Sequence, residues 1–142
     1  MKKELIILIA LRSCSPCPAG IVADTLFFEC RGESKAGRYA VASVIWNRWT
    51  AGKDSGRTLK GVCMARRQFS CWNTGHKSAN PSSKHEILIL AQAKAWSKLM
   101  QDGKGLPSGT WTHYHAKRVN PYWSKGMTNK KTIGRHLFGN TK

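Results

Sequence analysis

FFECRGESKAGRYAVASVIWNRW, residues 27–49, contains the end of one predicted helix, a short turn and most of a second helix. The first helix is predicted over residues 18–31, because a proline suits its first turn and a glycine follows its end. Ser34 can cap a second helix that runs to about Thr50, with apolar residues recurring at helical spacing. The apolar faces of these two helices predict that they form the core.

A third helix is predicted further along the chain by its capping residues. Ser83 and Glu86 form a capping box ahead of a long run with apolar residues at helical spacing, and Asp102 followed by glycine closes it. Residues 53–82 are rich in Gly, Ser, Asn, Lys and Arg, with one short apolar run at 59–64. We predict a long irregular segment there.

Two short segments near the C-terminus predict strands. TWTHYHA at 110–116 and TIGRHLF at 132–138 alternate in polarity and are rich in threonine, aromatic residues and isoleucine. They can pair as a small antiparallel hairpin. The predicted fold class is therefore a helix-dominated α+β.

The length of 142 residues fits one compact domain, which we assign to residues 20–142. Residues 1–19 contain two lysines, a short apolar run from Leu5 to Leu11 and small residues at their end. They are either a signal-like segment or an N-terminal helical segment. No stretch approaches the roughly 18 apolar residues that a membrane span needs.

The charge of the chain is strongly unbalanced. Lysine and arginine total 24 against seven aspartate and glutamate residues, which gives a formal net charge of +17. Because the cations are spread along the whole chain, they indicate a positive surface, and an extended polyanion is the expected partner. Nucleic acid is one such polymer, and the anionic polymers of a bacterial wall or outer membrane are another.

The five cysteines form an odd set that cannot pair completely within the chain. Cys14 and Cys17 have the spacing of half a zinc site, but no second pair with that spacing follows. A disulfide between Cys63 and Cys71 and a set of reduced, buried thiols are the remaining alternatives.

Acid–base chemistry in this chain must use one of its seven carboxylates. Most of them lie in a loop, at a helix end or near the N-terminus, which leaves Glu29 and Glu33, with Asp24 behind them. On the first predicted helix, both glutamates lie on the stripe of apolar Val22 and Leu26. A carboxyl group at the edge of an apolar surface loses hydration, which favours the neutral, proton-donating form. An ion pair with a nearby cation is the alternative role for Glu29.

Four motifs follow one another in a specific order and spacing. They are ECRGESKAGRYAVASVIWNR at 29–48, QFSCW at 68–72, THYHAKRVNPYWSKGM at 112–127 and TIGRHLF at 132–138. In these motifs, over about residues 20–138, the chain resembles the SleB-like cell-wall hydrolases, a family of spore-cortex-lytic and phage enzymes. The resemblance implies a lysozyme-like fold and action on peptidoglycan as a muramidase or lytic transglycosylase.

The resemblance makes Glu29 the catalytic acid/base that cleaves the bond between N-acetylmuramic acid and N-acetylglucosamine. The scarcity of carboxylates suits a lytic transglycosylase, which can protonate the leaving oxygen and then deprotonate the sugar's own 6-hydroxyl with one group. Glu33, the second candidate catalytic residue, is either a second carboxylate of the site or closes the turn by bonding backbone amides.

The substrate-binding candidates rest on the same resemblance. They are Gln68, Phe69, Ser70, Tyr114 and His115. Neutral hydrogen-bonding groups and flat aromatic faces are the groups that sugars bind. His113 and His115 share a strand face, but no third ligand lies nearby in the sequence, so we expect no metal and no cofactor.

We expect peptidoglycan glycan strands and anionic wall or outer-membrane polymers as partners, no specific nucleic acid, and a monomer. The expected place of action is the bacterial cell wall or periplasm, reached by a signal-like N-terminus, holin-assisted release or delivery in a virion. Two alternatives stay open. One is a small basic nucleic-acid-binding domain, and the other is a wall-binding module without catalysis.

Overall fold

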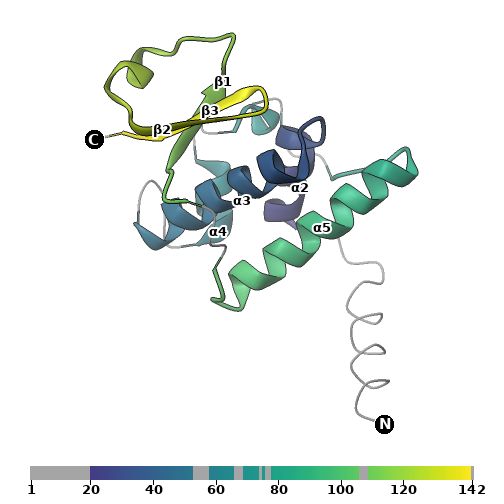
Figure 1. The fold of residues 1–142 in the computed structure, drawn as a ribbon. Helices are drawn as coiled ribbons and strands as arrows, with labels where there is room; N and C mark the ends of the chain where they lie inside the picture. Colours follow the sequence, from purple (N-terminus) through teal and green to yellow (C-terminus); the bar gives the residue numbers. More distant parts are fainter. Residues whose placement is uncertain are drawn as a thin grey trace.

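The computed structural model describes residues 20–52, 58–65, 69–73, 75, 78–105 and 109–141. The predicted N-terminal segment, residues 1–19, lies outside this described part. The elements are, in chain order, α2 (Ile21–Cys30), α3 (Lys35–Thr50), α4 (Leu59–Met64), the 3₁₀ turn η1 (Ser70–Trp72), α5 (Lys84–Gln101), β1 (His113–Ala116), the 3₁₀ turn η2 (Tyr122–Gly126), β2 (Thr128–Ile133) and β3 (His136–Asn140). The helices pack together, and the sheet lies against one side of them (Figure 1). Within the described part, no helix combines the length and apolar character needed to cross a membrane.

The two long helices begin where their capping residues predict. Ser34 Oγ accepts a hydrogen bond from the Gly37 N–H at 3.2 Å, which starts α3. Ser83 Oγ accepts one from the Glu86 N–H at 3.1 Å, which starts α5. The Glu86 carboxylate accepts from the N–H and hydroxyl of Ser82 instead of closing the capping box on Ser83.

The first predicted helix is present as α2 but ends at Cys30, and this changes the position of Glu33. Gly32 follows the helix, and the Glu33 N–H donates to the Cys30 carbonyl at 3.0 Å in the turn before α3. The prediction that Glu29 and Glu33 share one helical stripe is therefore wrong. The helix stops before Glu33 because the next helix needs its own cap only one residue later.

The segment predicted as irregular contains the short helix α4. Thr58 Oγ1 caps it by accepting from the Gly61 N–H at 2.9 Å, and Val62 and Cys63 are buried. The prediction of an irregular segment is wrong for these residues, because a helix of less than two turns shows almost no periodicity in the sequence. A second short turn, η1, follows in the same segment.

The predicted segment at 110–116 contains β1, whereas the segment at 132–138 contains the end of β2, a turn at Gly134 and Arg135, and the start of β3. The three strands form an antiparallel sheet of order β1-β3-β2. Tyr114 lies opposite Phe138 and Ala116 opposite His136, so these four side chains share one sheet face. The hairpin therefore becomes a three-stranded sheet. The first four residues of β2, 128–131, escaped prediction because they are exposed and polar, and the pairing of the strand is irregular after Thr128.

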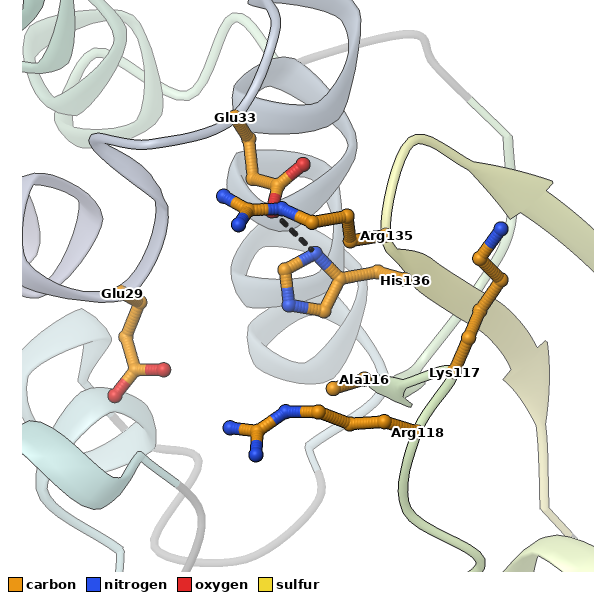
Figure 2. Close-up of a pocket in the computed structure, with 7 residues that line it drawn as sticks. All are labelled: Glu29, Glu33, Ala116, Lys117, Arg118, Arg135 and His136. Atoms are coloured by element: carbon orange, nitrogen blue, oxygen red, sulfur yellow. Dashed lines mark hydrogen bonds and ion pairs between the residues drawn. The ribbon is translucent and has the colours of Figure 1, made fainter.

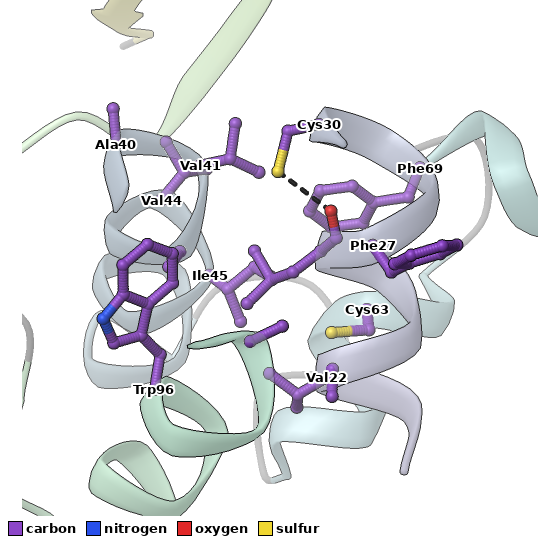
Figure 3. Packing of buried hydrophobic residues seen from close by; sticks show 14 of the residues in the cluster. Val22, Phe27, Cys30, Ala40, Val41, Val44, Ile45, Cys63, Phe69 and Trp96 are labelled. Atoms are coloured by element: carbon purple, nitrogen blue, oxygen red, sulfur yellow. Dashed lines mark hydrogen bonds between the residues drawn. The ribbon is translucent and has the colours of Figure 1, made fainter. Parts of the chain in front are cut away.

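The core surrounds α2. This helix packs against α3, α4 and α5, and its residues 22–27 are all buried. Figure 3 shows Val41, Val44 and Ile45 of α3 facing Phe27 and Cys30 of α2. Since α2 is enclosed on nearly all sides, its last turn is a rigid place from which to present a side chain.

The sheet is joined to this core by Phe138. Its ring is 0% exposed, stacks on Tyr114 at a centroid distance of 5.5 Å and lies 5.6 Å from Trp111. Asn47 of α3 also donates to the Trp111 carbonyl at 2.9 Å. The sheet is thus fixed to α3 by both packing and hydrogen bonding.

Phe138→Ala should lower the free energy of unfolding by about 3–5 kcal/mol, because it leaves a cavity between sheet and helices. Urea denaturation followed by circular dichroism measures the change. Tyr122→Ala removes an aromatic ring that is 86% exposed, so this control should change stability by less than about 0.5 kcal/mol. Equal losses in the two variants would contradict the role given to Phe138.

Candidate active site

A cavity of about 460 Å³ lies between the turn after α2 and the ends of β1 and β3 (Figure 2). It is lined by Glu29, Glu33, Ala116, Lys117, Arg118, Arg135 and His136. The structure therefore brings both candidate carboxylates to one pocket, although only Glu29 lies on the helix.

The carboxylate of Glu29 is held by neutral donors from two distant segments. Its Oε1 accepts hydrogen bonds from the Ser70 hydroxyl at 3.3 Å and from the Cys71 N–H at 3.0 Å. Its Oε2 accepts from the Tyr114 hydroxyl at 3.2 Å. Within the described residues, no lysine or arginine forms an ion pair with it. The carboxylate is thus oriented at the pocket wall without a neutralising cation.

Tyr114 is fixed as a donor to Glu29. Burial, and then the Glu29 charge, raise the pKa of the Tyr114 hydroxyl well above its ordinary value. The hydroxyl therefore keeps its proton at all physiological pH values. The ring is braced by Phe138 on one side and by Phe69 at a centroid distance of 6.4 Å.

Cys71 contacts Glu29 through its thiol as well as its backbone. Burial raises the pKa of the Cys71 thiol to about 12, with further contributions from the Glu29 charge and a hydrogen bond to Glu29. Burial also raises the pKa of Cys63 to about 12. The structure has free thiols at Cys30, Cys63 and Cys71, which supports reduced cysteines over a disulfide between Cys63 and Cys71. Cys14 and Cys17 lie outside the described residues.

Glu33 is engaged by groups on the β2–β3 turn. Its side chain is only 7% exposed, its Oε1 accepts from Arg135 Nε at 3.1 Å, and His136 Nδ1 lies 3.4 Å away. Gly134 has a φ of +58°, a backbone conformation that favours glycine, and a Cβ there would lie 2.8 Å from Glu33 Oε2. Glu33 therefore joins the turn after α2 to the turn between β2 and β3.

Figure 2 shows His136 beside Glu33, with one ring nitrogen directed at the Glu33 carboxylate. Burial lowers the pKa of the His136 imidazole. The negative charges of Glu33 and Glu29 partly oppose this effect, whereas the positive charges of Arg135 and His115 lower the pKa further. The imidazole is therefore predominantly neutral at neutral pH.

The other described carboxylates have structural partners. Asp24 is buried and accepts from the Ala79 N–H at 3.0 Å, so it fastens the segment before α5 to α2. Glu86 accepts from the Ser82 hydroxyl at 2.7 Å just before α5, and Asp102 pairs with Lys98 at 3.6 Å. In the described part of the chain, no three His, Cys, Asp or Glu residues cluster as a metal site would require.

The predicted substrate-binding residues fall into different places. Ser70 and Tyr114 contact Glu29, whereas Phe69 is buried behind Tyr114. His115 lies on the opposite face of β1, where Trp123 packs against it at 5.7 Å. Gln68 lies outside the described residues. The structure thus brings two of these five residues to the carboxylate.

Sequence reasoning missed several residues of the pocket and of the contacts around Glu29. They are Cys71, Ala116, Lys117, Arg118, Arg135 and His136. Gly134 was the available signal, because a glycine between two short strands indicates a tight turn and places its neighbours at a sheet end.

Glu29→Gln should increase the alkylation rate of Cys71 by iodoacetamide at about pH 8 severalfold, since loss of the Glu29 charge lowers the thiol pKa and raises the thiolate fraction. Peptide-resolved mass spectrometry measures the rate. Cys63 is the internal control, because its pKa is raised by burial without a contribution from Glu29. An unchanged Cys71 rate would show that the thiol does not contact the carboxylate.

His136→Gln should flatten the dependence of stability on pH below about pH 7. In the wild type, as the pH falls, His136 of the unfolded chain is protonated near the ordinary histidine pKa of 6.5, whereas folded His136 is protonated only at a lower pH. The free energy of unfolding therefore decreases as the pH drops from about 7 toward the lowered pKa. Urea midpoints between about pH 7 and pH 5 measure this slope. Parallel slopes in the two proteins would contradict the assignment.

The family model described as cell wall hydrolase matches residues 32–139, most of the chain, beginning just after Glu29. Spore cortex-lytic enzymes are similar in sequence: the one from Bacillus cereus is 27% identical over 119 residues, and the one from Oceanobacillus iheyensis is 28% identical over 119 residues. These matches cover 83% of this chain but only 42% and 40% of the relatives. The chain thus spans about two fifths of their length.

Two solved structures share the fold. The catalytic domain of Bacillus cereus SleB has a TM-score of 0.62 at 26% identity, covering 84% of this chain and 87% of that one. The catalytic domain of the germination-specific lytic transglycosylase SleB from Bacillus anthracis has a TM-score of 0.63 at 26% identity, covering 84% and 91%. The predicted lysozyme-like α+β fold is confirmed, and the chain belongs to the cell wall hydrolase family.

Proposed function

We propose that this protein cleaves the bond between N-acetylmuramic acid and N-acetylglucosamine in peptidoglycan, as a lytic transglycosylase with Glu29 as acid/base. One observation carries the proposal. Glu29 lines the cavity and is oriented by Ser70, Cys71 and Tyr114 without an ion pair to a described residue. Membership of the cell wall hydrolase family and the names of its relatives support the substrate.

In the first step, protonated Glu29 donates its proton to the glycosidic oxygen, and the bond from that oxygen to the anomeric carbon breaks. Positive charge develops on the sugar ring, next to the carboxylate that the proton has just left. The Cys71 N–H and the Tyr114 hydroxyl hold the carboxylate oxygens in place during this change.

In the second step, the Glu29 carboxylate accepts the proton of the 6-hydroxyl of the same muramic acid. The 6-oxygen bonds to the anomeric carbon, which closes a 1,6-anhydro ring and returns Glu29 to its protonated form. No water is consumed, so one carboxylate is sufficient.

Glu33 acts as a positioning residue in this proposal. Its side chain is nearly buried, and its carboxylate is already engaged by the Arg135 guanidinium. Its contribution is to fix the sheet end that forms one wall of the pocket. The action takes place at the bacterial cell wall, where the +17 charge favours contact with anionic polymers.

Glu29→Gln should reduce the clearing of purified peptidoglycan suspensions by more than about 10²-fold, because Gln keeps the shape of Glu but has no proton to donate. The thermal midpoint should stay within a few degrees. Glu33→Gln should lower activity less and stability more, since it loosens Arg135.

Glu86→Gln is the matched control, because it removes the same charge on α5, away from the pocket. Its activity should equal that of the wild type. Activity of Glu29→Gln within threefold of the wild type would refute the assignment and leave a wall-binding module. If Glu33→Gln were the more damaging change, the two roles would be exchanged.

A further inference from the structure

The pocket contains cations that its carboxylates do not neutralise. Three basic residues line it with Glu29, and one of them, Arg135, bonds to Glu33 and to the Gly32 carbonyl at 3.1 Å each. Lys117 and Arg118 are exposed, and neither forms an ion pair with a described residue. The pocket therefore carries excess positive charge.

The backbone that carries Arg118 is fixed by hydrogen bonds. The Val119 N–H donates to the Ala116 carbonyl at 3.0 Å, which closes a β-turn, and the Lys117 N–H donates to the Arg135 carbonyl at 2.8 Å. In Figure 2 the Arg118 guanidinium extends into the pocket toward Glu29, while the Lys117 ammonium points away. Among the described residues that line the pocket, Arg118 is thus the cation that faces Glu29 without an ion pair.

A free cation in this position works against the proposed chemistry. Cleavage of a glycosidic bond develops positive charge on the sugar, and a nearby positive charge raises the energy of that state. Among the described residues that line the pocket, Glu33 is the only other acid, and Arg135 already occupies it. At the start of the proposed reaction Glu29 is protonated, so no carboxylate among the described lining residues is left for Arg118, and the anion that pairs with it comes with the substrate.

We propose that Arg118 binds a carboxylate of the peptide stem that is attached to the muramic acid being cleaved. This inference rests on the proposed function. The planar guanidinium matches a carboxylate with two parallel hydrogen bonds, and the stem starts from the same sugar whose bond breaks. Binding the stem cancels the charge that opposes the reaction. The pocket is therefore specific for glycan strands that carry stems with free carboxylates.

The test compares three preparations of short soluble glycan strands. The first carries native stems, and the second carries the same stems with their carboxylates converted to amides by carbodiimide and ammonia. The third has been stripped of stems by an amidase, which leaves the carboxylate of the lactyl group on the sugar. Rates of cleavage by the wild type and Arg118→Gln are measured on each, by chromatography of the products.

Arg118→Gln should lower kcat/KM roughly three- to fivefold on the native stems, the range expected for an exposed ion pair. On the amidated and stripped strands, the wild type and Arg118→Gln should have equal kcat/KM values. Arg118→Lys should recover part of the loss on native stems, since lysine keeps the positive charge but lacks the two parallel N–H donors of the guanidinium. Lys130→Gln removes one exposed charge on β2 outside the pocket, so this control should match the wild type.

An equal loss on native and amidated strands would overturn the proposal, because Arg118 would then act without a stem carboxylate. A loss of the same size on stripped strands would also overturn it, and would assign Arg118 to the lactyl carboxylate instead. The proposed function is judged separately with Glu29→Gln on the native strands. If that variant stays active, the proposed function fails whatever the result with Arg118.

Discussion

The hydrogen bonds to Glu29 join three parts of the chain that are distant in sequence. Ser70 and Cys71 come from η1, Tyr114 comes from β1, and the carboxylate itself ends a helix that is buried on nearly all sides. A carboxylate at the edge of a core must be hydrogen-bonded, because leaving it unsatisfied costs far more than the bonds contribute. The same bonds orient it toward the pocket, so stability and proposed chemistry depend on one arrangement.

The two glutamates show how environment separates the roles of identical side chains. Among the described residues, the groups that donate hydrogen bonds to Glu29 are neutral, whereas Glu33 accepts from Arg135 and lies against Gly134 in the β2–β3 turn. A carboxylate paired with arginine is stabilised in its charged form and holds structure. In the proposed mechanism, the unpaired one is left to exchange a proton.

The sequence predicted much of this fold through local signals. Ser34 and Ser83 cap the helices predicted to start there, and the strand segments at 110–116 and 132–138 contain most of the residues that pair in β1 and β3. Local signals also failed in definite ways. Helix α4 is too short to show a period, and the exposed, polar strand β2 has no apolar face to reveal it.

The candidate site was predictable only in part, because its geometry comes from contacts distant in sequence. The scarcity of carboxylates and the family motifs singled out Glu29, but its partners depend on how the sheet meets the helices. Glu33 and Arg135 are 102 positions apart, so their pairing has no local signature. His115 was predicted to bind substrate, but side chains alternate along β1, so it lies on the face opposite to Tyr114.

In the proposed mechanism, one carboxylate acts as both acid and base, and no water is consumed. Digestion of peptidoglycan in water labelled with the heavy oxygen isotope, followed by mass spectrometry of the muropeptides, tests it most directly. We expect 1,6-anhydromuramic ends that contain no label, and labelled reducing ends would contradict the proposed mechanism.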